Sequence, residues 1–190
     1  MIRVLVVDDH PALRAGLYTV LRYEPGIVPV GAATGEDELL PALDRTRPDV
    51  VLLDYNLTGR DGIQLCRLIK TNDPAPAVLM YTAYDSAELA LPAALAGADG
   101  VLEKSATADE LFEAIRTVAR GERTLPPISR DSLTRANSRI DPRDLPLLGM
   151  LLDRATTADI ADALRIQTDE LEPRIEQMLH QLRLDAAAAQ

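Results

Sequence analysis

Five side chains that could carry out phosphoryl chemistry stand just past apolar segments of strand length: Asp8, Asp9, Asp54, Thr82 and Lys104. Carboxylates held close together repel one another and need a cation, and their hard oxygen atoms suit Mg²⁺. A carboxylate beside such an ion can attack a phosphoryl group as a nucleophile. The ammonium of a lysine would then neutralise charge on the transferring oxygens, and a threonine hydroxyl would donate a hydrogen bond to one of them.

The segments that must position these residues alternate between strand-like and helix-like patterns over the first 120 residues. The predicted strands are Ile2–Val7, Ile27–Ala33, Val50–Leu53, Ala77–Tyr81 and a short one at Val101–Leu102. The predicted helices are Pro11–Arg22, Glu36–Leu43, Gly62–Lys70, Ser86–Ala96 and Ala108–Arg120. Strands without polar alternation are buried on both faces, as in parallel sheets covered by helices. We therefore predict an α/β fold with a five-stranded doubly wound parallel sheet of the flavodoxin-like type.

Ligands of such sheets bind at the carboxyl ends of the strands, where the five side chains would gather. Taken alone, each acidic residue is more simply a turn or cap residue, because Asp favours those positions. Their joint placement at four of five strand ends favours a common site instead.

Four segments around these residues resemble the receiver domains of two-component response regulators. They begin at Val4, Val50, Val78 and Gly97 and end at His10, Gly62, Ala83 and Lys104. The resemblance covers residues 1–120 and implies that a histidine kinase phosphorylates Asp54. It implies that Asp9, Asp54 and the carbonyl of Asn56 bind Mg²⁺, with Asp8 bonded to the waters of the ion. It also implies a set of residues at the phosphoryl group or at the switch position, namely Thr82, Ala83, Lys104 and Val101.

One of these positions departs from the family pattern. Members often place Tyr or Phe three residues before the lysine, where the ring swings inward on phosphorylation, but this chain has Val101. A valine cannot gate by rotating a ring, which leaves open whether phosphorylation is used in the ordinary way. Tyr81 and Tyr84 flank Thr82, and one of them could substitute, although packing or surface roles are the simpler interpretation.

The remaining residues predict a linker and a second, small all-α domain. Residues 121–139 are polar and interrupted by two prolines, which is typical of a linker. Residues 140–184 resemble the LuxR/NarL-type helix-turn-helix, with helical patterns at Pro142–Asp153, Thr157–Leu164 and Thr168–Leu182. Pro173 either kinks the last of these helices or marks a later start. Residues 185–190 form an alanine-rich tail.

The charge of the second domain complicates its function. Residues 140–190 contain 10 acidic and five basic residues and no lysine, whereas a DNA-binding surface normally clusters Lys and Arg. Only Thr168 and Arg174 stand out as candidate DNA contacts on the expected recognition helix. Two functions stay open: a regulator of transcription that binds DNA, and a receiver whose degenerate helical domain acts through protein partners.

An enzymatic function is the weakest alternative. Phosphohydrolases with an aspartate nucleophile usually place a second Asp two residues later, where this chain has Asn56. We therefore expect a phosphoryl acceptor with at most slow self-dephosphorylation. In related proteins the fourth helix, fifth strand and fifth helix respond to phosphorylation, so we predict a homodimer through about Ser86–Arg120.

Composition indicates the compartment. The only cysteine, Cys66, excludes an internal disulfide and fits a reducing environment. No apolar stretch approaches the roughly 18 residues of a membrane span, and the apolar start is too short for a signal peptide. We expect a cytoplasmic protein without membrane contact.

Overall fold

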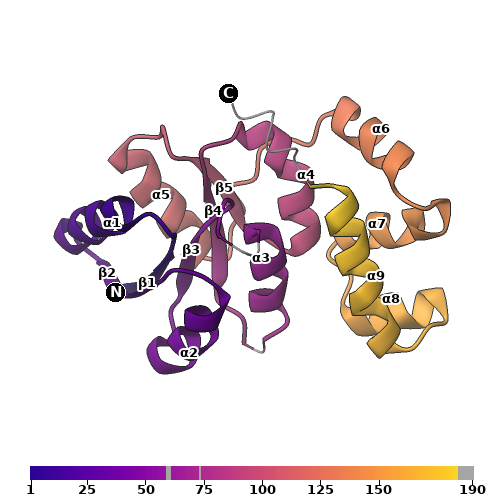
Figure 1. Cartoon of the computed structure of the whole chain (residues 1–190), viewed down its shortest axis with the longest axis horizontal. Coiled ribbons are helices and arrows are strands. Elements are labelled where there is room, and N and C mark those ends of the chain that lie inside the picture. Colours follow the sequence, from indigo (N-terminus) through magenta and orange to yellow (C-terminus); the bar gives the residue numbers. More distant parts are fainter. Residues whose placement is uncertain (59–60, 73, 184–190) are drawn as a thin grey trace.

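The computed structural model describes residues 1–58, 61–72 and 74–183, and contains one parallel sheet followed by a group of helices (Figure 1). The sheet domain consists of β1 (Ile2–Val7), α1 (Pro11–Tyr23), β2 (Ile27–Ala33), α2 (Glu36–Thr46), β3 (Val50–Asp54), α3 (Gly62–Lys70), β4 (Ala77–Thr82), α4 (Ser86–Ala96), β5 (Gly100–Glu103) and α5 (Ala108–Ala119). The C-terminal helices are α6 (Arg130–Arg139), the 3₁₀ turn η1 (Pro142–Asp144), α7 (Leu145–Leu152), α8 (Thr157–Leu164) and α9 (Thr168–Gln181).

The sheet has the order β2-β1-β3-β4-β5 with all neighbours parallel, which confirms the predicted fold class. Its two faces are both apolar, because alternate residues of each strand point to opposite sides. On β3, Val50 and Leu52 pack with α1 and α5, whereas Val51 and Leu53 pack on the face covered by α2, α3 and α4. This explains why the sequence showed continuous apolar runs.

The predicted linker contains a helix that the sequence did not indicate. Its residues 130–139 form α6, which begins where the Ser129 side chain accepts a hydrogen bond from the Ser132 backbone N–H. The sequence shows no sign of this helix because α6 is polar and buries only Ser132 and Ala136, which leaves too little apolar periodicity to detect.

The C-terminal helices pack against the sheet domain, with α6, α7 and α9 all contacting α4 and α9 also contacting α3 (Figure 1). Residues Leu89–Ala96 of α4 are all buried as a result. The surface predicted to pair two receivers begins with this helix. In the present arrangement the α4 part of that surface is therefore covered by the chain's own C-terminal helices.

Other details of the C-terminal region follow the sequence closely. Pro173 lies inside α9, so it does not mark a later start of that helix. The expected tail, residues 185–190, lies outside the described residues. Within the residues that the structure describes, no helix is both long and apolar enough to span a membrane.

Candidate functional site

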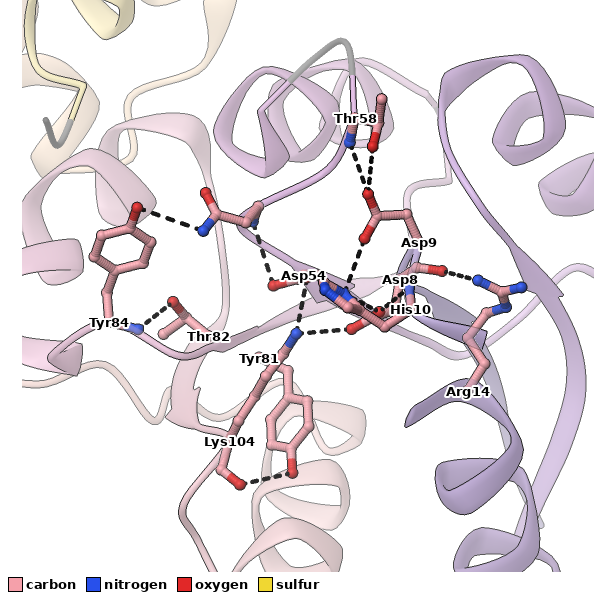
Figure 2. Close-up of polar contacts among 11 residues, drawn as sticks. Asp8, Asp9, His10, Arg14, Asp54, Thr58, Tyr81, Thr82, Tyr84 and Lys104 are labelled. Atoms are coloured by element: carbon pink, nitrogen blue, oxygen red, sulfur yellow. Dashed lines mark hydrogen bonds and ion pairs between the residues drawn. The ribbon is translucent and has the colours of Figure 1, made fainter. Parts of the chain in front are cut away.

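The carboxyl ends of β1, β3 and β5 bring three predicted site residues into direct contact. Lys104 Nζ lies 2.8 Å from Asp8 Oδ2 and 2.8 Å from Asp54 Oδ2 (Figure 2). Lys104 is held in register because its backbone N–H donates to the Thr82 carbonyl at the end of β4. The predicted convergence of the acidic strand ends and the lysine is therefore present.

Burial sets the electrostatics of this group. Asp54 is 3% exposed, and this burial raises the pKa of its carboxyl against the opposing effect of the Lys104 ammonium. Burial on its own would lower the pKa of Lys104, but hydrogen bonds to Asp54 and Asp8 outweigh it and raise that pKa. Lys104 thus stays charged and screens two neighbouring carboxylates that would otherwise repel each other.

Asp9 is held by a different loop. Its Oδ2 accepts hydrogen bonds from the Thr58 hydroxyl at 2.6 Å and the Thr58 backbone N–H at 3.0 Å. The hydroxyl bond is the main reason why the pKa of Asp9 is lowered. His10 Nδ1 lies 3.0 Å from Asp9 Oδ1, so the imidazole faces the carboxylate pair. Asp9 is consequently charged and fixed toward the centre of the site.

The donor atoms of this site fit a divalent cation. Ligand atoms of Asp8, Asp9, His10 and Asp54 all lie within 4.8 Å of one another. Among the described residues, Asp9 Oδ1 and Asp54 Oδ2 are buried and accept no well-formed hydrogen bond beyond their ion-pair contacts. These oxygens therefore keep lone pairs for an ion, and an oxygen-rich set of this kind suits Mg²⁺.

A glycine allows the loop after β3 to turn back on the acceptor. The Gly62 N–H donates to the Tyr55 carbonyl at 2.8 Å, and a Cβ at this position would lie 2.1 Å from the Asp54 carbonyl oxygen. Asp61 is the N-cap residue of α3, and its Oδ1 accepts a hydrogen bond from the Gln64 N–H at 2.9 Å. Gly62 is therefore required sterically at the start of α3.

Thr82 and its neighbours form the other side of the site (Figure 2). Thr82 is fully buried, and its Oγ1 accepts a hydrogen bond from the Tyr84 N–H at 3.0 Å. The Tyr84 hydroxyl accepts from Asn56 Nδ2 at 3.4 Å, and the Tyr84 ring meets the Tyr55 ring edge to face at 5.1 Å. Tyr84, in the loop after β4, thus contacts the loop that follows Asp54.

The other predicted residues occupy a range of positions. Val101 is buried in the core, where it packs as an aliphatic side chain, and Ala83 is exposed in the loop after β4. The Asn56 backbone N–H donates to Asp54 Oδ1 at 3.3 Å, so this residue does lie beside the acceptor. Sequence reasoning missed Thr58 as a partner of Asp9, and the only available signal was its position four residues after Asp54.

Charged pairs join the site's surroundings to the C-terminal helices. Arg67 on α3 makes a two-point ion pair with Glu172 on α9, with Nε 2.9 Å from Oε2. Asp61, in the loop that follows the acceptor, pairs with Arg183 just after α9. At the opposite edge of the sheet, Arg154 Nη2 lies 3.1 Å from Asp99 Oδ1. The two parts of the chain therefore have complementary charges where they meet.

The candidate DNA contacts differ in accessibility. Thr168 is exposed at the first position of α9. Arg174 is occupied within the C-terminal helices, because its Nε lies 2.9 Å from Asp144 Oδ1. Only Thr168 is open to a partner in this arrangement, and its role on DNA stays a prediction.

Known proteins share this architecture. A family model described as the response regulator receiver domain matches residues 4–116. The chain is 31% identical over 195 residues to the DNA-binding transcriptional activator DevR/DosR of Mycobacterium tuberculosis (strain ATCC 25618 / H37Rv), covering 97% of this chain and 90% of that protein. The crystal structure of the response regulator ChrA of a heme-sensing two-component system aligns with a TM-score of 0.56 at 31% identity, over 99% of this chain and 94% of that one. A LuxR-family two-component response regulator from Aurantimonas sp. SI85-9A1 aligns with a TM-score of 0.63 at 35% identity, over 67% of this chain and 91% of that one.

Proposed function

The chain belongs to the LuxR-family response regulators of two-component systems, which regulate transcription, and we propose that Asp54 is its phosphoryl acceptor. The observation that carries the proposal is the contact of Lys104 with both Asp54 and Asp8 at the end of the sheet. In the proposed reaction an Asp54 oxygen attacks the phosphorus of a kinase phosphohistidine, a P–O bond forms, the P–N bond breaks, and the imidazole leaves.

The residues around Asp54 have distinct tasks. Asp9, Asp54 and the Asn56 carbonyl would hold Mg²⁺, with Asp8 beside its waters, and the ion would supply positive charge for the phosphoryl oxygens. Lys104 supplies a second positive charge at the acceptor oxygen. Asp54 must be ionised to attack; burial raises the pKa of its carboxyl, and the Lys104 ammonium opposes that shift. The chain acts as an acceptor in the cytoplasm, with only slow self-dephosphorylation.

Acetyl phosphate, a small phosphoryl donor, tests the assignment. Wild-type protein with Mg²⁺ should gain one phosphoryl group, read as a band shift on a phosphate-binding gel, and Asp54→Asn should gain none. Asp109→Asn is the matched control, because Asp109 is an exposed acid on α5. Chelation of the metal should abolish the shift. Equal labelling of Asp54→Asn and wild type would contradict the proposal.

Control of transcription requires an output, and we assign DNA binding to α8 and α9. The relative DevR/DosR is named as a DNA-binding activator. In the present arrangement α9 is packed on α3 and α4, and its acidic Glu172 is engaged with Arg67. We infer that phosphorylation favours release of these helices. Binding to duplex DNA, measured by fluorescence anisotropy, should strengthen with the phosphoryl mimic beryllofluoride and weaken steeply with added salt.

The same release would uncover α4 for the proposed homodimer through Ser86–Arg120. Light scattering should show a monomer without beryllofluoride and a dimer with it. An unchanged mass in both conditions would exclude pairing through this surface.

A further inference from the structure

We propose that Tyr84 is the positioning residue that couples the state of Asp54 to the C-terminal helices, a role that rests on the phosphorylation of Asp54 proposed above. The chain needs such a residue because Val101 is a small side chain, 4% exposed and packed in the core. A side chain with no ring and no polar atom cannot report a change in Thr82.

Tyr84 contacts both Thr82 and the loop that follows Asp54. Its backbone N–H donates to Thr82 Oγ1, and its hydroxyl accepts from the side chain of Asn56 (Figure 2). Its ring is perpendicular to that of Tyr55, with an interplanar angle of 83°. Tyr55 and Asn56 directly follow Asp54, so one buried side chain joins the loop after β3 to the loop after β4.

The other candidate aromatic residue, Tyr81, faces the wrong side of the sheet. It packs with Leu111 and Ile115 of α5, on the face covered by α1 and α5. Its hydroxyl donates to the Lys104 carbonyl at 3.4 Å. Tyr84 instead belongs to the core shared by α3, α4 and the C-terminal helices. Only Tyr84, of the two, lies on the side where the output is attached.

A path from Thr82 to the C-terminal helices follows from these contacts. When the Thr82 hydroxyl turns toward Asp54 to donate to a phosphoryl oxygen, the Tyr84 N–H bonded to its Oγ1 is drawn with it. The ring and hydroxyl of Tyr84, which contact Tyr55 and Asn56, then direct how the loop after β4 shifts. Tyr84 immediately precedes Asp85, whose side chain caps α4 by accepting from the Ala87 N–H at 2.8 Å. A shift of Tyr84 therefore moves the start of α4, and α6, α7 and α9 all contact this helix.

Substitution at position 84 tests the role in the full-length chain. Tyr84→Leu removes the ring and hydroxyl but keeps the backbone donor, and Tyr84→Met is the second variant in case the leucine variant does not fold. Tyr81→Phe is the matched control, since it removes one long tyrosine hydrogen bond from the opposite face. Phosphoryl uptake from acetyl phosphate is measured alongside amide hydrogen exchange of α4 and α9, with and without beryllofluoride and Mg²⁺.

Because Tyr84 contacts Asn56 and Thr82, the rate of phosphoryl uptake is measured for each variant and the exchange is compared at saturating beryllofluoride. We expect α4 and α9 of the Tyr84 variants to stay protected without beryllofluoride. The rise in exchange that beryllofluoride causes in α4 and α9 should fall by about fivefold or more, the lower end of typical coupling between sites. Tyr81→Phe should respond as wild type does. A folded Tyr84 variant with a full beryllofluoride response would overturn the role of Tyr84 alone, whereas wild-type protein that accepts no phosphate would overturn the proposed function as well.

Discussion

Reversing one charge at the contact between α3 and α9 should open the molecule without phosphorylation. The change is Glu172→Arg, which places a second cation against Arg67. In the structure these side chains are 14% and 34% exposed, for Arg67 and Glu172 respectively, and they meet through two nitrogen–oxygen contacts. The pair is therefore intermediate between a surface ion pair and a buried one.

This intermediate exposure of the ion pair sets the free-energy cost expected for Glu172→Arg. Exposed ion pairs contribute at most about 1 kcal/mol, and breaking a buried pair costs roughly 3–5 kcal/mol. We expect the reversal to cost the closed arrangement about 2 kcal/mol, which shifts the equilibrium between closed and open forms by roughly 30-fold. Asp61–Arg183 and Asp99–Arg154 remain intact and would hold part of the interface.

Amide hydrogen exchange of α4 measures this shift, because the docked C-terminal helices cover one side of its buried segment Leu89–Ala96. Glu172→Arg should speed their exchange, and the swapped double variant Arg67→Glu/Glu172→Arg should restore slow exchange. Arg143→Glu is the control, since Arg143 is 87% exposed and pairs locally with Asp141. The reasoning fails if Glu172→Arg exchanges like wild type, or if the swap does not restore protection.

Three further predictions concern single sites. Gly62→Ala should lower the free energy of unfolding, measured by urea denaturation, by about 3 kcal/mol because its Cβ would overlap the Asp54 carbonyl. Gly16→Ala, at an exposed position of α1, should leave the free energy of unfolding unchanged or raise it in the same assay. Arg165→Gly should stabilise by about 0.5 kcal/mol in the same assay, because Arg165 ends α8 at φ 55, a conformation that suits glycine. Burial raises the pKa of the Cys66 thiol from 9.0 to about 12. The folded chain therefore keeps a proton that the unfolded chain loses above pH 9.0, and the free energy of unfolding should fall as the pH rises from 9.0 to about 12. Rapid labelling of Cys66 by a thiol reagent in the folded state would contradict this burial.

The sheet and its site were predictable because their signals are local. Each strand is a short apolar run, and parallel strands bring their carboxyl ends to one edge whatever the details of packing. Knowing that Asp54 and Lys104 each end a strand was therefore enough to expect them together, and the structure confirms the contact at 2.8 Å. The predicted bounds of α3 and α4 also agree with the structure, in which the Asp61 and Asp85 side chains cap these two helices.

The contacts between the two parts of the chain had no such signal. Arg67 and Glu172 are separated by 105 residues, and nothing in either neighbourhood indicates the other. Acidic residues at the start of a helix suit the positive end of its dipole, so those of α9 do not by themselves indicate a role in docking. Tyr84 was noticed beside Thr82, but only the folded chain shows that it reaches Asn56 whereas Tyr81 reaches the backbone of Lys104.

The composition of α4 constrains how the molecule can be activated. From Leu89 to Ala96 the helix is entirely apolar, so it has no face suited to water and must be covered on two sides. The sheet covers one side, and the C-terminal helices cover the other in the closed form.

If phosphorylation releases those helices, an isolated open monomer would expose this surface, and pairing with a second receiver would cover it again. Closure and pairing then compete for one surface, so the open form should be populated mainly as a dimer. Its fraction should rise with protein concentration at fixed beryllofluoride, as mass action requires. Analytical ultracentrifugation combined with exchange measurements on α4 would show this, and an open monomer that persists on dilution would refute it.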